Sequence, residues 1–134
     1  MRLVSDTVWG MLTVLQEASN QSDDAMTGVA EVILERTRQC WRSDGSVVST
    51  VLAPAQFSGW NTRDPNRIRV GKMDDRDPVV GRAREAWDRA SQRATLTFGA
   101  VMYHDTRVTP DWIPEFTRVC QIGDLIFYAR KAAP

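Results

Sequence analysis

The chain has 134 residues, a length that fits a single domain over residues 1–134 with a sizeable buried core. Its 17 basic and 17 acidic side chains cancel, so no global field attracts nucleic acid or an anionic membrane surface, and we expect neither as a partner. No apolar run approaches the roughly 18 residues of a membrane-spanning helix. These features are typical of a soluble globular protein, which we expect to be a monomer.

The two cysteines, Cys40 and Cys120, lie far apart in the chain and lack the CxxC spacing of a zinc site. The chain contains one histidine, so we expect no metal site and no cofactor. The sequence does not choose between two free thiols and a single disulfide.

Two amphipathic helices are predicted at the start of the chain. Apolar residues at helical spacing predict the first over about residues 6–16, with Ser5 as its N-cap. After a polar break, Ser22 is placed to cap the second helix, whose inner face runs from Met26 to Thr37. Each helix therefore presents one apolar stripe to the interior.

Three charged residues on the second helix receive separate interpretations. Glu31 and Glu35 are one turn apart and face away from the apolar stripe, so we expect both to be solvated. Arg36 lies beside the apolar face, where an arginine usually snorkels to solvent or pairs with a carboxylate. We expect Arg36 to be a structural partner and not a catalytic residue.

The middle of the chain alternates between helix signals and a loop. Residues 46–52 predict a short third helix or turn. Residues 62–76 are rich in Arg, Asp, Gly and Pro and lack periodicity, which favours a surface loop. Asp77-Pro78 combines an N-cap with a proline in the first turn, and so begins a helix that continues to about Ser91.

The pattern changes to strands towards the C-terminus. Apolar side chains alternate with polar or small ones over residues 95–102, which predicts a strand. Residues 119–122 and 125–128 flank Gly123-Asp124, a two-residue hairpin signal. Helices followed by a small antiparallel sheet indicate the α+β class, mainly helical with the hairpin near the C-terminus.

Glu17 is the candidate catalytic residue. It closes the first helix, where the negative end of the helix dipole disfavours an ionised carboxylate. Partial burial acts in the same direction, because desolvation favours the neutral form of a carboxyl group. A carboxylic acid that stays protonated near neutral pH is what cleavage of a glycosidic bond requires.

Four segments of the chain carry a resemblance to a known family. They are Glu17-Ala18 with the helix at 29–36, residues 54–58 with Trp60, residues 99–104 with 108–112, and residues 122–128. In this order and spacing they resemble the cell-wall hydrolase family typified by spore-cortex-lytic enzymes and related phage endolysins.

The resemblance implies a lysozyme-like fold that cuts peptidoglycan glycan strands between N-acetylmuramic acid and N-acetylglucosamine. Members look like lytic transglycosylases, in which one glutamate, here Glu17, serves as acid and then as base. The family often carries a second glutamate in the same stretch, and Gln21 stands there in this chain. One carboxyl group suffices in a transglycosylase, because the 6-hydroxyl group of the muramic acid itself attacks.

The same resemblance extends the candidate site. We expect the hydroxyl group of Tyr103 to act catalytically beside Glu17, by stabilising the oxocarbenium-like state or orienting the sugar, and one of Tyr103 and His104 to face the cleft. The candidate substrate-binding residues offer amide, hydroxyl, imidazole and aromatic groups, and they are Gln56, Phe57, Ser58, Trp60, His104, Trp112 and Tyr128. Structural interpretations stay open for several of them, such as a loop anchor for Phe57 and core packing for Trp112.

Two other functions stay open, namely a muramidase that uses water and a non-catalytic glycan-binding module that kept the fold. In each case the expected partner is the glycan strand of peptidoglycan. Residues 1–6 lack the pattern of a signal peptide. We therefore expect a phage endolysin that is made in the host cytoplasm and acts on the bacterial cell wall, in the periplasm, after release through a holin.

Overall fold

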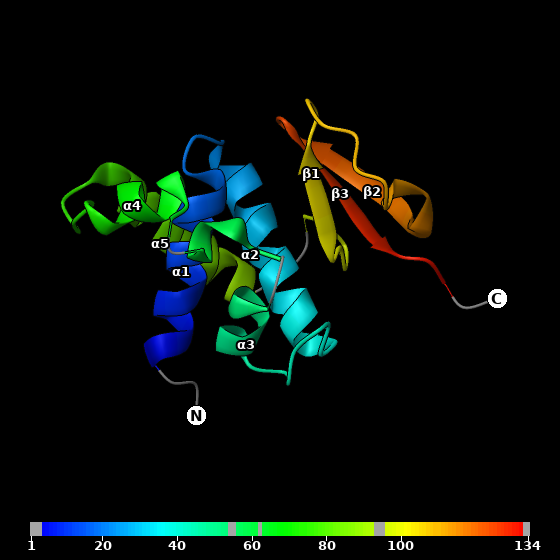
Figure 1. Cartoon of the computed structure of the whole chain (residues 1–134), viewed down its shortest axis with the longest axis horizontal. Coiled ribbons are helices and arrows are strands. Elements are labelled where there is room, and N and C mark those ends of the chain that lie inside the picture. The colour runs from blue at the N-terminus through cyan, green and yellow to red at the C-terminus, as the bar shows by residue number, and fades with distance from the viewer. Residues whose placement is uncertain (1–3, 54–55, 62, 93–95, 133–134) are drawn as a thin grey trace.

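The computed structural model describes residues 4–53, 56–61, 63–92 and 96–132. A group of helices forms one side of the molecule and a three-stranded antiparallel sheet forms the other (Figure 1). The α-helices are α1 (Val4–Ala18), α2 (Asp23–Arg38), α3 (Val47–Leu52), α4 (Pro65–Gly71) and α5 (Pro78–Gln92). The strands are β1 (Met102–Asp105), β2 (Phe116–Ile122) and β3 (Leu125–Arg130), and the 3-10 turns are η1 (Ser58–Trp60) and η2 (Ile113–Glu115). This mainly helical α+β arrangement confirms the predicted fold class.

Side-chain caps set the starts of several helices. The Ser22 hydroxyl oxygen accepts a hydrogen bond from the Ala25 N–H at 3.2 Å, so the predicted cap of α2 is confirmed. The predicted start of α5 is also confirmed, and the Asp77 carboxylate accepts from the Val79 N–H at 3.2 Å. The predicted cap of α1 is wrong, because α1 begins at Val4 and Ser5 lies inside the helix.

Helix α2 lies between the other helices and the sheet, and its inner face forms the centre of the core (Figure 1). Gly28 allows α2 to approach the sheet closely. A Cβ atom at Gly28 would lie 2.7 Å from the Cζ atom of Phe127 on β3, which is closer than atoms can pack. The absence of a side chain at this position therefore lets the buried Phe127 ring pack directly on the α2 backbone.

The sheet has the strand order β1-β3-β2, with both neighbouring pairs antiparallel. Ile122 pairs with Leu125 across Gly123-Asp124, which confirms the predicted hairpin. Gly123 has φ +57°, a left-handed conformation that glycine adopts without strain. Along β1, Met102 and His104 are buried and alternate with Tyr103 and Asp105, so the latter two share the opposite face of the sheet.

The prediction of a loop over residues 62–76 is wrong in part, because α4 lies within it. The Asp64 carboxylate caps this helix by accepting the Asn66 N–H at 2.8 Å, and Pro65 occupies its first turn. Val70 is the buried residue of α4. Two turns with one buried side chain leave no apolar periodicity to detect, although the Asp-Pro pair is the same signal that begins α5.

The predicted strand over 95–102 is shorter than expected, because β1 begins at Met102; residues 93–95 lie outside the described ranges. Residues 97–100 instead form a tight turn, closed by the Ala100 N–H donating to the Thr97 carbonyl at 3.1 Å. Phe98 and Gly99 at its corner have φ values of +48° and +85°. The alternation of apolar with polar or small residues over 95–102 was misleading, because it continues through residues 97–100, which form a turn and not a strand.

The expectation that Glu31 and Glu35 are solvated is also wrong. Glu31 is fully buried, and its carboxyl group accepts hydrogen bonds from the N–H groups of Leu96 and Thr97 and from the Thr97 hydroxyl at 2.9–3.2 Å. These bonds occupy the backbone donors that a strand would otherwise use. Glu35 is largely covered and is paired with Arg38, and it also accepts from the Gln39 amide.

Cys40 and Cys120 are both free thiols, so the structure contains two unpaired cysteines where the sequence left a disulfide open. Among the residues that the structure describes, no three histidine, cysteine or acidic side chains gather as metal ligands would. In the same ranges, none of the helices has the length and apolarity that a bilayer span demands.

Candidate active site

Glu17 lies in the last turn of α1 and carries the most perturbed carboxyl group of the candidate site. Its pKa is raised from 4.5 to about 7, chiefly by burial, and the nearby negative charge of Asp64 acts in the same direction. A hydrogen bond from the Gly59 backbone opposes this rise, as do the positive charge of Arg36 and a hydrogen bond with Tyr103. The Glu17 Oε1 atom is buried and has no hydrogen-bond partner among the described residues. The carboxyl group is therefore partly protonated at neutral pH.

Tyr103, in the middle of β1, places its phenol group against Glu17. Burial raises the pKa of this hydroxyl group well above its usual value, and the neighbouring Glu17 charge raises it further. The phenol therefore keeps its proton and serves as a hydrogen-bond donor. Its ring also packs on Phe127, with the centroids 5.8 Å apart, which fixes its position on the sheet.

The segment that carries Gly59 is held tightly against α1. The Trp60 indole N–H donates to the Thr13 hydroxyl at 2.8 Å, and the Trp60 ring lies 4.8 Å from the ring of Trp9. A Cβ atom at Gly59 would lie 2.6 Å from the Gln16 Oε1 atom. A glycine at this position therefore lets the backbone N–H reach the end of α1, where Glu17 accepts it.

Arg36 connects the helices to the start of β1. It is buried, and its Nε atom donates to the Val101 carbonyl at 2.5 Å while Nη1 donates to the Gln56 amide oxygen at 3.3 Å. Its guanidinium group lies 4.9 Å above the Phe57 ring. These contacts confirm that Arg36 is a structural partner, and they also place its charge beside Glu17.

Two hollows meet at Glu17 and Tyr103, which line both of them. The first hollow has a volume of about 660 Å³ and is mostly polar; its lining residues are Gln16, Glu17, Ser19, Asn20, Gln21, Asn66, Arg69, Val79, Tyr103, Asp105, Arg107 and Leu125. The second hollow has about 290 Å³ and contains arginine and aromatic side chains; its lining residues are Glu17, Arg36, Arg42, Gln56, Phe57, Met102, Tyr103 and Trp112. The candidate acid therefore lies where two hollows adjoin.

Not all of the sequence-predicted site residues line these hollows. Gln56, Phe57 and Trp112 line the second hollow, and Tyr103 lines both. Trp60 lines neither hollow and packs on α1 instead, as described above. The side chain of Ser58 lies outside the described part of the structure.

His104 and Tyr128 lie on the other face of the sheet from Tyr103. The His104 Nε2 atom and the Tyr128 hydroxyl are hydrogen-bonded at 2.8 Å, and the Trp112 ring packs edge-on against both side chains. Of the pair at 103 and 104, the residue that faces the cleft is therefore Tyr103. Trp112 packs on this buried group and also lines the second hollow.

Several residues of the two hollows were missed by the sequence analysis. Asn20 follows Glu17 closely and could have been found from its position alone. Asp105 follows Tyr103 on the same face of β1, so alternation gave a usable signal. Arg42 and Arg69 had no local pattern, because each reaches its hollow only through the tertiary fold.

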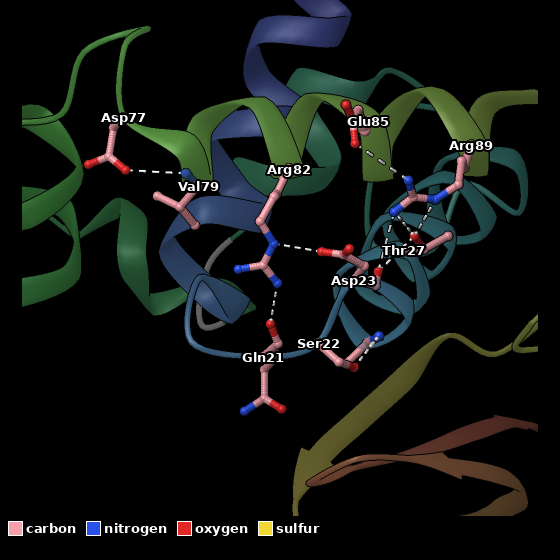
Figure 2. Close-up of polar contacts among 10 residues, drawn as sticks. Gln21, Ser22, Asp23, Thr27, Asp77, Val79, Arg82, Glu85 and Arg89 are labelled. Carbon is pink, nitrogen blue, oxygen red and sulfur yellow. Dashed lines mark hydrogen bonds and ion pairs between the residues drawn. The ribbon is translucent and has the colours of Figure 1, made fainter.

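Helix α5 fixes the turn that connects Glu17 to α2 (Figure 2). Arg82 donates to the Gln21 carbonyl at 2.7 Å and to the Asp23 carboxylate at 2.6 Å. Two turns further along α5, Arg89 donates to the Thr27 hydroxyl at 2.9 Å (Figure 2). Because Gln21 lines the first hollow, these contacts hold one wall of that hollow in place.

The chain belongs to the cell wall hydrolase family, because the model of that family matches residues 20–128, most of its length. It is thus a peptidoglycan-cleaving enzyme, and the resemblance on which the sequence analysis relied is confirmed. Glu17 lies just before the matched segment, so its assignment as the candidate acid rests on its burial and its neighbours and not on the family match.

A solved structure shares the fold. The catalytic domain of the germination-specific lytic transglycosylase SleB from Bacillus anthracis superposes with a TM-score of 0.73. The two chains are 20% identical, over 95% of this chain and 96% of that one. At this identity the likeness shows a common lysozyme-like fold. No curated protein sequence matches the chain.

The raised pKa of Glu17 predicts that this residue destabilises the fold at alkaline pH. Between pH 4.5 and about 7 the unfolded chain ionises this carboxyl group while the folded chain retains the proton, so stability falls as the pH rises. The full loss, about 3 kcal/mol, is reached above pH 7. We expect Glu17→Gln to raise the free energy of unfolding at pH 8 by up to about that amount and to change it little at pH 4. Urea denaturation at both pH values measures this, with the exposed Glu115→Gln as control. An equal difference at the two pH values would contradict it.

Proposed function

We propose that this enzyme is a lytic transglycosylase that cleaves the bond between N-acetylmuramic acid and N-acetylglucosamine, with Glu17 as its acid and base. The observation that carries the proposal is the buried Glu17 carboxyl group, with a pKa of about 7, at the junction of two hollows. A polymer cut within its length needs binding space on both sides of the reacting bond. A group that is partly protonated at neutral pH can give and then take a proton there.

In this mechanism the protonated Glu17 donates its proton to the glycosidic oxygen as the bond to the anomeric carbon breaks. The resulting carboxylate then accepts the proton of the muramic acid 6-hydroxyl group, whose oxygen bonds to the same anomeric carbon. The product is a 1,6-anhydro sugar, no water is consumed, and Glu17 regains its proton. An intramolecular nucleophile is already in position, so a second carboxylate is not needed.

Tyr103 assists Glu17 in this proposal. Its hydroxyl group keeps its proton and lies within hydrogen-bonding reach of the Glu17 carboxyl group, so it stabilises the carboxylate after proton transfer. Arg36 adds a fixed positive charge beside the same carboxylate. The similarity in fold to a catalytic domain that is named a lytic transglycosylase further supports this reaction type.

A muramidase that uses water is the second candidate, and Asp105 is the observation in its favour. Asp105 lines the first hollow together with Glu17, where a second carboxylate would activate water. However, Arg107 occupies both Asp105 oxygens at 2.8–2.9 Å and holds the pKa of this carboxyl group at about 2. Such a carboxylate is a weak base. We therefore favour the transglycosylase.

We further propose that the chain acts as a monomer and as a phage endolysin. One chain supplies the acid and the described walls of both hollows, which supports action without a partner. The resemblance of the four sequence segments to phage endolysins supports the biological role, in which the enzyme is made in the host cytoplasm and reaches the wall through a holin.

Glu17→Gln is expected to reduce peptidoglycan cleavage at least 100-fold, because the amide cannot donate the proton. Clearance of purified bacterial walls measures the rate, and mass spectrometry of the released muropeptides identifies their ends. Anhydro ends in the wild type support the transglycosylase, and reducing ends would show the muramidase instead. Asp105→Asn is the matched control for the second reaction, and we expect it to leave the anhydro ends unchanged.

Tyr103→Phe is expected to lower the maximal rate roughly 10- to 100-fold, as the loss of a transition-state hydrogen bond does. The hydrogen bond with Tyr103 lowers the pKa of Glu17, so its removal should move the alkaline decline of the rate to higher pH. The pH profile of wall clearance tests this. A profile that falls in amplitude without any shift would assign Tyr103 to a purely structural role.

The endolysin role predicts a dependence on a membrane pore. We expect cells that express the enzyme in the cytoplasm to lyse rapidly only when a holin is also expressed, because peptidoglycan lies outside the cytoplasmic membrane. The optical density of the culture measures lysis, and Glu17→Gln with the holin controls for damage by the pore itself. Equally rapid lysis without a holin would contradict the proposed route.

A further inference from the structure

The second hollow carries a net positive charge. Two guanidinium groups, those of Arg36 and Arg42, line it, and Glu17 is its one carboxyl group among the described lining residues. Since Glu17 is partly protonated at neutral pH, it does not balance two fixed positive charges. The pKa of Arg36 is lowered to about 10, mainly by burial and in part by the charge of Arg42. The two arginines therefore repel each other across this space.

The two guanidinium groups differ in how many of their N–H donors are hydrogen-bonded to the protein. Arg36 is buried and donates to the Val101 carbonyl and the Gln56 amide oxygen, as described above. Arg42 is exposed, and its guanidinium group makes no hydrogen bond or ion pair with the described part of the chain. The Arg42 guanidinium group does make a cation–π contact with the Trp41 ring, 5.3 Å from the ring centroid. The donors of Arg42 are therefore free to bind a ligand.

The backbone that presents Arg42 is strained. Cys40 and Arg42 have φ values of +52° and +54°, a left-handed conformation that side chains other than glycine rarely adopt. The surrounding contacts hold it, since the Trp41 N–H donates to the Arg36 carbonyl at 2.8 Å and the Trp41 ring lies 4.7 Å from the Arg130 guanidinium group. Strain that is held in this way is concentrated at ligand-binding sites.

The remaining lining of the second hollow suits a sugar. Trp112 and Phe57 supply aromatic surface, and Gln56 supplies an amide group. Aromatic faces pack on sugar rings, while an arginine fork binds a carboxylate through two parallel hydrogen bonds. The hollow thus combines a surface for a pyranose with an unsatisfied cation.

We propose that the second hollow is a subsite for the muramyl sugar and that Arg42 binds a carboxylate carried on its lactyl arm. This inference rests on the proposed function, since it assumes that the glycan strand occupies both hollows. The carboxylate has two possible sources: the lactyl group itself in a strand without peptides, or the peptide stem attached to it. In both cases the enzyme distinguishes acidic muramyl strands from neutral polymers of N-acetylglucosamine.

The test measures binding of soluble tetrasaccharides by calorimetry. The ligands are an alternating muramyl glycan with free lactyl carboxylates, the same glycan with peptide stems, both glycans with their carboxylates converted to amides, and the neutral N-acetylglucosamine tetramer. All proteins carry Glu17→Gln to prevent cleavage, with Arg42→Gln or the control Arg84→Gln added. Arg84 is an exposed residue of α5 that lines neither hollow. The left-handed backbone at position 42 is equally unfavourable for glutamine and for arginine, so Arg42→Gln removes the positive charge without changing the backbone strain.

We expect Arg42→Gln to weaken binding of at least one carboxylate-bearing glycan about tenfold, as loss of a charge-assisted hydrogen bond does, and Arg42→Lys to restore part of it. Binding of the amidated glycans and the neutral tetramer should change less than about twofold in the same variant. The stem-free glycan identifies the lactyl group as the source if it shows the effect, and the stem peptide is the source if it does not.

The proposal is overturned if Arg42→Gln and Arg84→Gln have the same effect on the binding of all ligands. It is also overturned if the protein that retains Arg42 binds the acidic and the amidated glycans with equal affinity. A failure of the proposed function has a different signature. In that case the enzyme with Glu17 intact releases muropeptides with reducing ends, or releases no muropeptides. The effect of Arg42 on binding is measured separately, in the protein that carries Glu17→Gln.

Discussion

The desolvation of one carboxyl group is the constraint on which the rest of this site depends. Glu17 ends a helix whose dipole disfavours negative charge, and burial is the largest cause of its raised pKa. If it were fully exposed, the group would ionise well below neutral pH and could not donate a proton there. Gly59, Tyr103 and Arg36 each oppose the rise, so they limit it to a value near 7. The balance between burial and these three neighbours sets the pKa of Glu17, and with it the ability of this group to donate a proton near neutral pH.

This balance requires segments that are distant in sequence to meet within hydrogen-bonding distance. Glu31 on α2 binds the backbone at Leu96 and Thr97, and Arg36, just over one turn later, binds the Val101 carbonyl. Both contacts fix the chain immediately before β1, which sets the position of Tyr103. Buried polar groups of this kind are costly when left unpaired, so they specify one arrangement of the chain rather than merely stabilising it. Helix α2 therefore forms the centre of the core and also positions the segment that carries Tyr103.

Local signals in the sequence were sufficient for most of the fold. Apolar periodicity located the long helices, caps located the starts of α2 and α5, and Gly123-Asp124 located the hairpin. They failed where tertiary contacts decide the structure, as at Glu31, whose burial no local pattern indicates. In the site, Glu17 and Tyr103 were brought together as expected, whereas His104 turns to the other face because alternation allows only one of two neighbours to face the cleft. Arg42 had no signal, since its position depends on a strained loop that the sequence does not reveal.

The difference in charge between the two hollows has a consequence for the proposed reaction. A glycan strand of peptidoglycan alternates two sugars, and a transglycosylase must place the muramyl sugar, with its acidic arm, on a fixed side of the acid. A cleft with the same character on both sides would bind the strand in two registers, one of them unproductive. Here Arg69 and the paired Asp105 and Arg107 line the first hollow, which leaves one arginine there without a counter-charge. The second hollow has two arginines without a fixed counter-charge and is therefore the more positive of the two. Electrostatic complementarity suppresses the wrong alignment more effectively than it adds affinity, so this asymmetry can select the register in which Glu17 meets the correct bond.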